Sequence, residues 1–181
     1  LPISRMPLGE VFSGFFMGFI ILFLSVYIHL VDLELFVLNL VDNYLKLSIN
    51  LYELALLFLV ALPATLSTAL IMLANNICDM GDDWSNKRYT LPICIGKAKA
   101  LRLFKTLHYV AFIDIAALLL LRILPLAVAP VFLTVIPVKK NVDLFMRLQS
   151  KKDTFGVAVK NFMLINVSLT ALLLIGVMIQ K

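Results

Sequence analysis

Three aspartates within five residues, followed by two cations, form the stretch of this chain best suited to chemistry. The segment that starts at Asn75 reads NNICDMGDDWSNKRYTLP and lies between two long apolar runs. On a helix of about 3.6 residues per turn, Asn76, Asp79 and Asp83 share one face. Asn75, Asp79 and Asp82 share nearly the same face. Carboxylates this close repel one another unless a cation lies between them, so the spacing predicts a cation site.

Magnesium bound together with a phosphate-bearing substrate fits these residue types. Mg²⁺ prefers hard oxygen ligands and is typically held by one or two carboxylates plus substrate phosphates. We therefore predict Asp79 and Asp83 as metal ligands, with Asp82 as a third. Lys87 and Arg88 are predicted to meet the phosphate oxygens, Arg88 as a planar fork and Lys87 as a point charge. The alternative is a solvated loop with a charged helix cap, which the flanking membrane-length runs disfavour.

The composition predicts a membrane protein. The chain has 181 residues, of which 62% are hydrophobic, against roughly 45–50% in soluble domains. We expect an all-α polytopic membrane helical bundle with about five transmembrane helices. The expected spans are residues 10–30, 51–77, 103–124, 125–138 and 155–180. The net charge of +5 belongs to the loops, and no basic-aromatic patch points to nucleic acid.

Within these spans, three features carry structural expectations. Gly14 and Gly18 form a G-x-x-x-G pair that allows close helix approach. Pro63 predicts a kink in the second span. Asp114 lies well inside an apolar run, where a charge usually faces a cavity or a partner; a structural hydrogen bond to a neighbouring helix is the alternative.

Two further segments have the pattern of interfacial helices rather than spans. Polar residues form one helical stripe from Asn39 to Asn50, which predicts an amphipathic helix lying in the membrane interface. Residues 32–35 alternate and are compatible with extended structure. Residues 141–149 place Leu144, Phe145 and Leu148 on one face, which predicts a short interfacial helix.

The distribution of Lys and Arg predicts the orientation in the membrane. With five spans, twelve cations fall on the side of the carboxylate loop and three on the other, so the loop is expected to face the cytoplasm. The twelve are Arg5, Lys87, Arg88, Lys97, Lys99, Arg102, Lys105, Lys139, Lys140, Arg147, Lys151 and Lys152; the three are Lys46, Arg122 and Lys181. This bias predicts an integral protein of the cell (plasma) membrane.

The carboxylate loop resembles the second aspartate-rich motif of the UbiA-type intramembrane prenyltransferases. The resemblance rests on the pattern Asn75-Asn76-x-x-Asp79-x-x-x-Asp83 and on the residues Lys87, Arg88, Thr90, Leu91, Pro92 and Gly96 that follow it. The form is most like the 1,4-dihydroxy-2-naphthoate polyprenyltransferases, and the opening residues LPISRMPLGE are similar to the segment that enters that family's fifth helix. Cys78 stands where the family often has arginine, and Asn86 where it often has glycine.

The resemblance implies that residues 1–181 form the C-terminal half of a nine-helix prenyltransferase domain, helices five to nine. The N-terminal half, or a partner chain, would then supply the first aspartate-rich motif. The implied activity is Mg²⁺-dependent transfer of a polyprenyl group from polyprenyl diphosphate to an aromatic acceptor, dihydroxynaphthoate, in menaquinone biosynthesis. Asn75 and Asn76 are expected to assist at the diphosphate site. Arg5 and Glu10 are expected either to orient the acceptor or to lock the helix start.

Other functions stay open at this stage. A UbiA-type transferase acting on 4-hydroxybenzoate or homogentisate would carry the same loop. A non-catalytic membrane module whose basic loop binds lipid phosphate headgroups would also explain the cations. The phenylalanines of the first span are candidates to line an apolar substrate pocket, although contact with lipid or other helices explains most of them more simply; they are Phe12, Phe15, Phe16, Phe19 and Phe23.

Overall fold

Long apolar helices dominate the chain, as the hydrophobic runs predict. The computed structural model describes residues 6–29 and 35–179; the residues before Met6, including Arg5, and residues 30–34, which include the expected extended start, lie outside this range. The helices are α1 (Gly9–Ser13), η2 (Gly14–Ile20), α2 (Ile21–His29), α3 (Leu51–Cys78), α4 (Met80–Ser85), α5 (Leu91–Ile95), α6 (Lys97–Leu120), η4 (Leu126–Thr134), α7 (Val135–Arg147) and α8 (Gly156–Ile179). Two strands, β1 (Phe36–Val41) and β2 (Tyr44–Ile49), form a hairpin.

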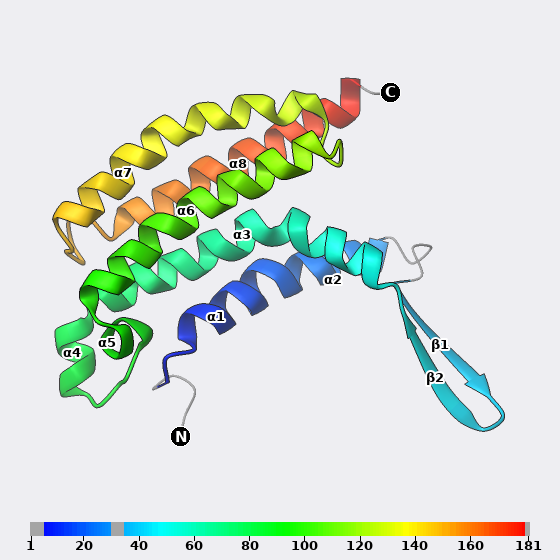
Figure 1. Ribbon diagram of the computed structural model, residues 1–181, viewed down its shortest axis with the longest axis horizontal. Helices are drawn as coiled ribbons and strands as arrows, with labels where there is room; N and C mark the ends of the chain where they lie inside the picture. Colours follow the sequence, from blue (N-terminus) through cyan, green and yellow to red (C-terminus); the bar gives the residue numbers. More distant parts are fainter. Residues whose placement is uncertain (1–5, 30–34, 180–181) are drawn as a thin grey trace.

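Within the described residues, four helices are long and apolar enough to cross a membrane: 9–29, α3, α6 and α8. Their bounds agree closely with four of the expected spans. The protein is thus an all-α polytopic membrane helical bundle, with the hairpin as its one addition. Helix α3 is central, because it packs against η2, α6 and α8. It contains Pro63, and Figure 1 shows it bent rather than straight.

The G-x-x-x-G pair does bring two helices close together. A Cβ on Gly14 would lie 2.8 Å from the Thr65 carbonyl oxygen, and one on Gly18 would lie 2.9 Å from the Thr65 backbone nitrogen. Both glycines lie in η2, whose backbone therefore rests almost directly on α3. This contact positions the first helix, and with it Glu10, against the end of α3.

The segment expected as a fourth span plus an interfacial helix forms a single helical rod. The 3-10 helix η4 continues directly into α7, and Figure 1 shows the rod running back along α6 and α8. The separate helix expected at 141–149 is therefore incorrect. Of its expected apolar face, Phe145 is buried in one stripe with Val138 and Val142, whereas Leu144 and Leu148 are about half exposed.

A buried polar chain ties the last three helices together. Asn141 Nδ2 on α7 donates to Asn161 Oδ1 on α8 at 2.8 Å, and Asn161 Nδ2 lies 3.0 Å from His108 Nε2 on α6. The other ring nitrogen, His108 Nδ1, lies 2.8 Å from the Phe104 carbonyl oxygen. His108 and Asn161 are almost fully buried, so this arrangement satisfies groups that would otherwise be costly inside the bundle.

The amphipathic helix expected at 39–50 is instead the β1–β2 hairpin. Val41 pairs with Tyr44, which leaves Asp42 and Asn43 as a two-residue turn with φ of 50° and 62°. Positive φ at both central residues is the mark of the turn that matches strand twist, and Asp and Asn tolerate it. The flanking leucines, valines and aromatics complete two short strands. The hairpin leaves the bundle beside the start of α3 (Figure 1).

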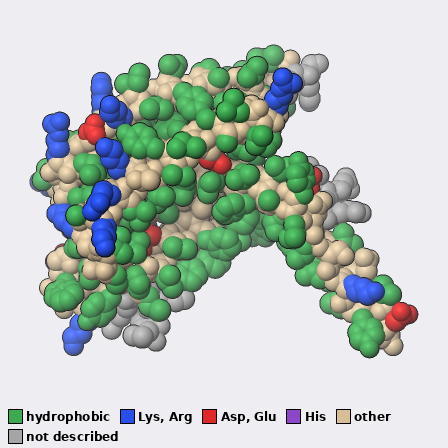
Figure 2. Space-filling model, in the orientation of Figure 1, with side chains coloured by type: hydrophobic (Ala, Val, Ile, Leu, Met, Phe, Trp, Pro, Cys, Tyr) green, Lys and Arg blue, Asp and Glu red, His purple; other side chains and the backbone are tan. Residues whose placement is uncertain are grey.

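Charge is distributed unequally between the two ends of the bundle. Figure 2 shows Lys and Arg side chains gathered at the end that carries α4 and α5. We call this the cation-rich end and define it by Lys87, Arg88, Lys97, Lys99 and Lys151. The hairpin and Arg122 lie at the opposite end. The segments expected on one side of the membrane, namely the carboxylate loop and the turn between α7 and α8, thus lie at one end of the molecule.

Candidate active site

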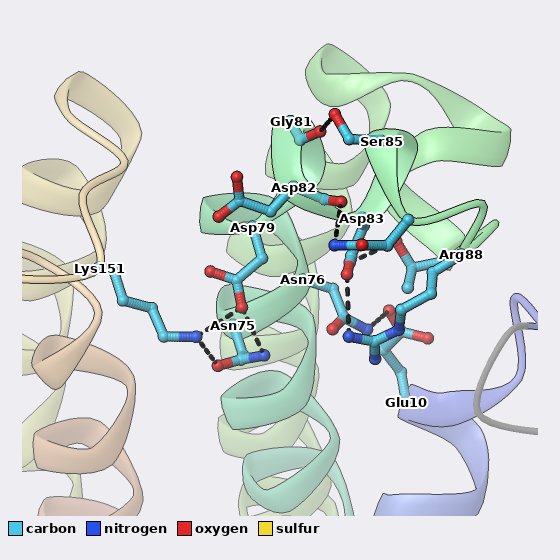
Figure 3. A network of polar contacts seen from close by, with 12 residues as sticks. Glu10, Asn75, Asn76, Asp79, Gly81, Asp82, Asp83, Ser85, Arg88 and Lys151 are labelled. Atoms are coloured by element: carbon cyan, nitrogen blue, oxygen red, sulfur yellow. Dashed lines mark hydrogen bonds and ion pairs between the residues drawn. The ribbon is translucent and has the colours of Figure 1, made fainter.

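The carboxylate loop is an almost continuous extension of α3. Asp79 ends α3 and precedes α4, with its backbone nitrogen bonded to the Asn75 carbonyl at 3.0 Å. The Asp83 nitrogen bonds in turn to the Asp79 carbonyl at 2.8 Å. Yet Asp79 has φ of −94° and ψ of 8°, so the chain turns between the two helices. The aspartates expected on one face consequently point to two sides (Figure 3).

The first side joins Asp79 to Asn75 and Lys151. Asn75 Nδ2 donates to Asp79 Oδ2 at 3.1 Å, and Lys151 Nζ lies 2.5 Å from the same oxygen. Lys151 Nζ also donates to Asn75 Oδ1. Lys151 comes from the turn between α7 and α8, 72 residues away from Asp79. The ammonium of Lys151 thus balances the Asp79 carboxylate, which is partly exposed.

The second side joins Asp83 to Arg88 and Thr90. Arg88 Nη1 lies 3.0 Å from Asp83 Oδ1, and Thr90 Oγ1 donates to Asp83 Oδ2 at 3.3 Å. The Arg88 backbone nitrogen also bonds to the Asp83 carbonyl at 2.9 Å. Asp83 and Thr90 are buried, whereas 43% of the Arg88 side chain is exposed. The loop from 84 to 90 is thereby folded back, and part of the Arg88 side chain remains exposed.

Glu10 and Asn76 form a buried pair between the first helix and α3. Asn76 Nδ2 donates to Glu10 Oε1 at 2.8 Å, and both side chains are at most 4% exposed. Among the described residues, Glu10 Oε2 and Asn76 Oδ1 are buried without a hydrogen-bond partner. The pair supplies the helix-locking contact anticipated for Glu10. It also leaves two oxygens with unused acceptor capacity.

Two expected site residues stay outside these contacts. Asp82 is exposed, and its side chain points away from Asp79 and Asp83 in Figure 3. Its backbone carbonyl accepts from Asn86 Nδ2 at 2.9 Å. Lys87 is exposed and takes a left-handed φ of 55° at the apex of the turn. Arg5 belongs to the residues that the structure does not describe.

The donor chemistry of the loop is compatible with magnesium, although the carboxylates are not gathered around one point. Within residues 6–29 and 35–179, no three His, Cys, Asp or Glu side chains lie together as a metal-binding group. Magnesium needs only one or two carboxylates when phosphates supply further ligands. The oxygens of Asp79, Asp83, Asn76 and Glu10 are all of the hard type, and those of Glu10 and Asn76 include the two unpartnered atoms. These residues therefore fit a metal held jointly with a substrate.

An apolar cavity of about 400 Å³ lies beside the Glu10–Asn76 pair. It runs between the first helix, α3 and α6, and its lining is almost wholly hydrocarbon apart from Glu10. The lining includes Gly14, Phe15, Phe58, Leu66 and Leu107. Of the five phenylalanines considered from the sequence, Phe15 is among the lining residues. Phe19 is buried and packs on Phe58 with ring centroids 5.2 Å apart.

Sequence reasoning missed Lys151 as a partner of the motif. It counted this lysine only as one of the cations on the cytoplasmic side. The helical spacing that links Asn75 to Asp79 is visible in the sequence, but a contact across 72 residues depends on how α8 packs beside α3. The dense cluster of cations was the available signal, and it does not single out one member.

Comparison with known proteins gives one informative similarity. No family model matches the chain, and no solved structure matches it. Over 120 residues, 66% of the chain, it is 30% identical to 1,4-dihydroxy-2-naphthoate octaprenyltransferase of Bacillus subtilis (strain 168). The match covers 32% of that protein, so the chain spans about a third of the length of this relative. The similarity supports the resemblance to UbiA-type prenyltransferases in the region that it covers.

Proposed function

We propose that residues 1–181 are the C-terminal half of a UbiA-type membrane prenyltransferase and form the diphosphate-binding side of its active site. The observation that carries this proposal is the arrangement of Asp79 and Asp83, two carboxylates on successive turns, each with its own cation. Asn76, near the same end of α3, bonds to Glu10, which lines an apolar cavity. The similarity to an octaprenyltransferase agrees with the proposal. The first aspartate-rich motif would come from a preceding half or a partner chain.

The cationic side chains have a defined role in this reaction. When the C–O bond of the prenyl diphosphate breaks, its electron pair leaves with the diphosphate, and negative charge grows on the departing oxygens. Arg88 and Lys151 are held beside the carboxylates, and Lys87 lies at the exposed turn; all three can bind those oxygens. Cations that already contact those oxygens when the substrate is bound would lower the barrier, because they need no further reorganisation as the charge develops.

Asp79 and Asp83 would hold Mg²⁺ together with the diphosphate, with Asn75 and Asn76 as supporting donors and Asp82 as a peripheral third carboxylate. The bound metal would supply neutralisation of the diphosphate charge. The cations that now contact Asp79 and Asp83 would then be released to contact phosphate oxygens. Each cation already lies beside its carboxylate, so it would have to move only a short distance to contact a phosphate bound there.

The cavity beside Glu10 would protect the allylic cation. Its hydrocarbon lining excludes water, which would otherwise quench the cation before the new carbon–carbon bond forms. The ring carbon of the acceptor supplies the electron pair of this bond. For 1,4-dihydroxy-2-naphthoate the ring then loses its carboxyl group as carbon dioxide. Glu10 lies at the polar boundary of the cavity, where an acceptor hydroxyl would be oriented.

We propose dihydroxynaphthoate as the acceptor, within menaquinone biosynthesis, and a site that faces the cytoplasm from the plasma membrane. The printed name of the relative supports this choice of acceptor. A competition assay on the complete protein with dihydroxynaphthoate, 4-hydroxybenzoate and homogentisate tests it. Preferential prenylation of either of the other two rings would reassign the substrate while leaving the transferase mechanism in place.

The central test is replacement of each carboxylate in the complete protein. Asp79→Ala and Asp83→Ala should each lower Mg²⁺-dependent prenyl transfer by at least about 100-fold, the usual cost of removing a group that stabilises developing charge. Asp143→Ala, which removes a carboxylate from α7, is the matched control and should keep near-normal turnover. Normal turnover in either loop variant would exclude the metal role.

The headgroup-binding alternative gives a different result in the same system. It predicts that the complete protein in detergent binds phosphatidic acid without Mg²⁺ and that Asp79→Asn retains this binding. If this binding is observed and the wild-type protein transfers no prenyl group, the headgroup-binding function is favoured over the enzyme.

A further inference from the structure

The β1–β2 hairpin has one wholly apolar face. Residues that pair directly across two strands lie on the same side of the sheet, and successive pairs alternate between the two sides. The pairs Phe36–Ile49, Leu38–Leu47 and Leu40–Leu45 therefore share a face. We call these six side chains the apolar face of the hairpin. The opposite side carries Val37, Asn39, Val41, Tyr44, Lys46 and Ser48.

This apolar face is largely open. Leu38, Leu40, Leu45 and Leu47 are between 56% and 74% exposed. Aligned leucines on both strands make a continuous patch rather than scattered apolar residues, and such patches mark contact with an apolar partner. An isolated two-stranded hairpin is also marginally stable in water, so a supporting surface is expected.

The apolar face continues directly into the surface of a membrane-spanning helix. Phe36, at the base of the apolar face, contacts Phe23 and Tyr27 of α2 with ring centroids 5.8 Å and 6.0 Å apart. At the other strand, a single residue, Asn50, separates β2 from α3. The Asn50 nitrogen bonds to the Leu35 carbonyl at 3.1 Å, and its side chain accepts from the Glu53 nitrogen at 3.2 Å. The hairpin is therefore fixed against α2 and the start of α3.

We propose that the hairpin is a membrane-interface anchor on the side opposite the carboxylate loop, with its apolar face in contact with lipid. Figure 1 shows the hairpin extending away from the helices from the boundary end of α2 and α3, which is the direction that places it beside the bundle in the plane of that leaflet. Asn39, Lys46 and Ser48 on the other face would contact water and headgroups. Lys46 can reach lipid phosphate groups.

Backbone hydrogen bonding limits the depth of insertion. A hairpin has two outer edges with unpaired N–H and C=O groups, which hydrocarbon cannot satisfy. The headgroup layer supplies water and polar partners for these edges while still accepting leucine side chains. The anchor therefore lies at the acyl–headgroup boundary and does not cross the bilayer. The hairpin and its helix contacts do not involve the carboxylate loop, so the anchor is independent of the proposed enzyme activity.

Site-directed spin labelling of the complete protein in phosphatidylcholine–phosphatidylglycerol vesicles tests the proposal. In a Cys78→Ser, Cys94→Ser background, nitroxides are attached after Leu40→Cys and Leu47→Cys on the apolar face. Matched controls are Asn39→Cys and Lys46→Cys on the polar face. Oxygen concentrates in the bilayer and a nickel chelate in water, so the ratio of oxygen to nickel accessibility should shift upward at 40 and 47 relative to 39 and 46.

Two other outcomes would overturn the anchor. High nickel accessibility at all four positions would place the hairpin in water. Protection of positions 40 and 47 from both reagents would show that protein covers the apolar face, either another part of the complete protein or a second copy. All four sites are exposed, so the labels themselves are compatible with folding.

Discussion

The ion pair between Lys151 and Asp79 is the contact that most changes how the carboxylate loop works. Lys151 Nζ serves Asp79 and Asn75 together and lies 5.4 Å from the centroid of the Phe155 ring. The Asp79 carboxylate is neutralised by Lys151, so its electrostatic repulsion of the Asp83 carboxylate is reduced. In the proposed reaction, the same ammonium would contact a phosphate oxygen once another cation takes its place beside Asp79. The turn between α7 and α8 is therefore part of the candidate site.

Removing this ammonium should impair transfer in the complete protein. Lys151→Ala is expected to lower turnover by about tenfold, because a charge-assisted hydrogen bond contributes on the order of 1.5–3 kcal/mol and solvent exposure reduces that. Lys152→Ala removes an equally exposed neighbouring charge and should leave turnover near normal. Steady-state prenyl transfer at saturating acceptor measures both. Equal effects of the two substitutions would show that Lys151 acts only through the general positive charge of this end.

Substitutions of Glu10 separate its two possible roles. Glu10→Gln keeps an acceptor for Asn76 Nδ2, whereas Glu10→Ala leaves that buried amide unpaired at a cost of about 1–3 kcal/mol. Thermal unfolding in detergent should therefore show destabilisation for Glu10→Ala alone. If Glu10 only locks α1 to α3, Glu10→Gln also keeps full turnover. A stable Glu10→Gln variant with reduced turnover would instead assign the carboxylate to the acceptor.

For individual residues, the sequence predicted which residue types form the site better than it predicted where their side chains point. The i, i+4 spacing correctly placed Asn75 and Asp79 on one face, and they are hydrogen bonded. It could not reveal that the chain turns at Asp79, which sends Asp83 to a different side. Nor could it pair Lys151 with Asp79, because local periodicity carries no information about distant segments.

Between elements, the backbone of η2 lies close to the backbone of α3 at Gly14 and Gly18. Gly18→Ala is expected to destabilise the protein by about 1–3 kcal/mol, because the added methyl would meet the α3 backbone rather than a movable side chain. Gly9→Ala is the control, since a Cβ there has open space around it. Thermal unfolding in detergent measures both. Unchanged stability of Gly18→Ala would mean that the two helices can separate at little cost.

The hairpin and the η4–α7 rod show why element type was harder to predict than element position. Residues 39–50 have polar side chains that fit a helical stripe and also fit strand alternation. The turn at Asp42 and Asn43 decides in favour of the strand, because a positive φ at both residues ends any helix there. The rod contains three prolines in or next to its helical turns. Pro130 and Pro137 lie inside helical turns, and Pro125 precedes the first of them.

At the scale of the whole molecule, the described part of the chain passes along the bundle five times, and the number of passes between two segments decides whether they share an end. The passes are 9–29, α3, α6, the η4–α7 rod and α8, as Figure 1 shows. The rod is less apolar than the other four passes because its second half carries Lys139, Lys140 and Arg147. Two passes, α6 and the rod, separate the carboxylate loop from Lys151, and this even number brings both to the same end. The sequence predicted this arrangement because apolar length and charge asymmetry are global properties.

The cation-rich end of the bundle is predicted to face the cytoplasm. Cations are retained on the cytoplasmic side of membranes, so the cation-rich end should be inaccessible from outside the cell. Cys94 on α5 is an exposed natural thiol at this end. In a Cys78→Ser background, a membrane-impermeant maleimide should label Cys94 in inside-out vesicles and leave it unmodified in intact cells. The opposite pattern is expected for Lys46→Cys in a Cys78→Ser, Cys94→Ser background, because the hairpin lies at the other end. Labelling of Cys94 in intact cells would show that the protein has the opposite orientation in the membrane. The carboxylates would then face away from the compartment where prenyl diphosphates are made.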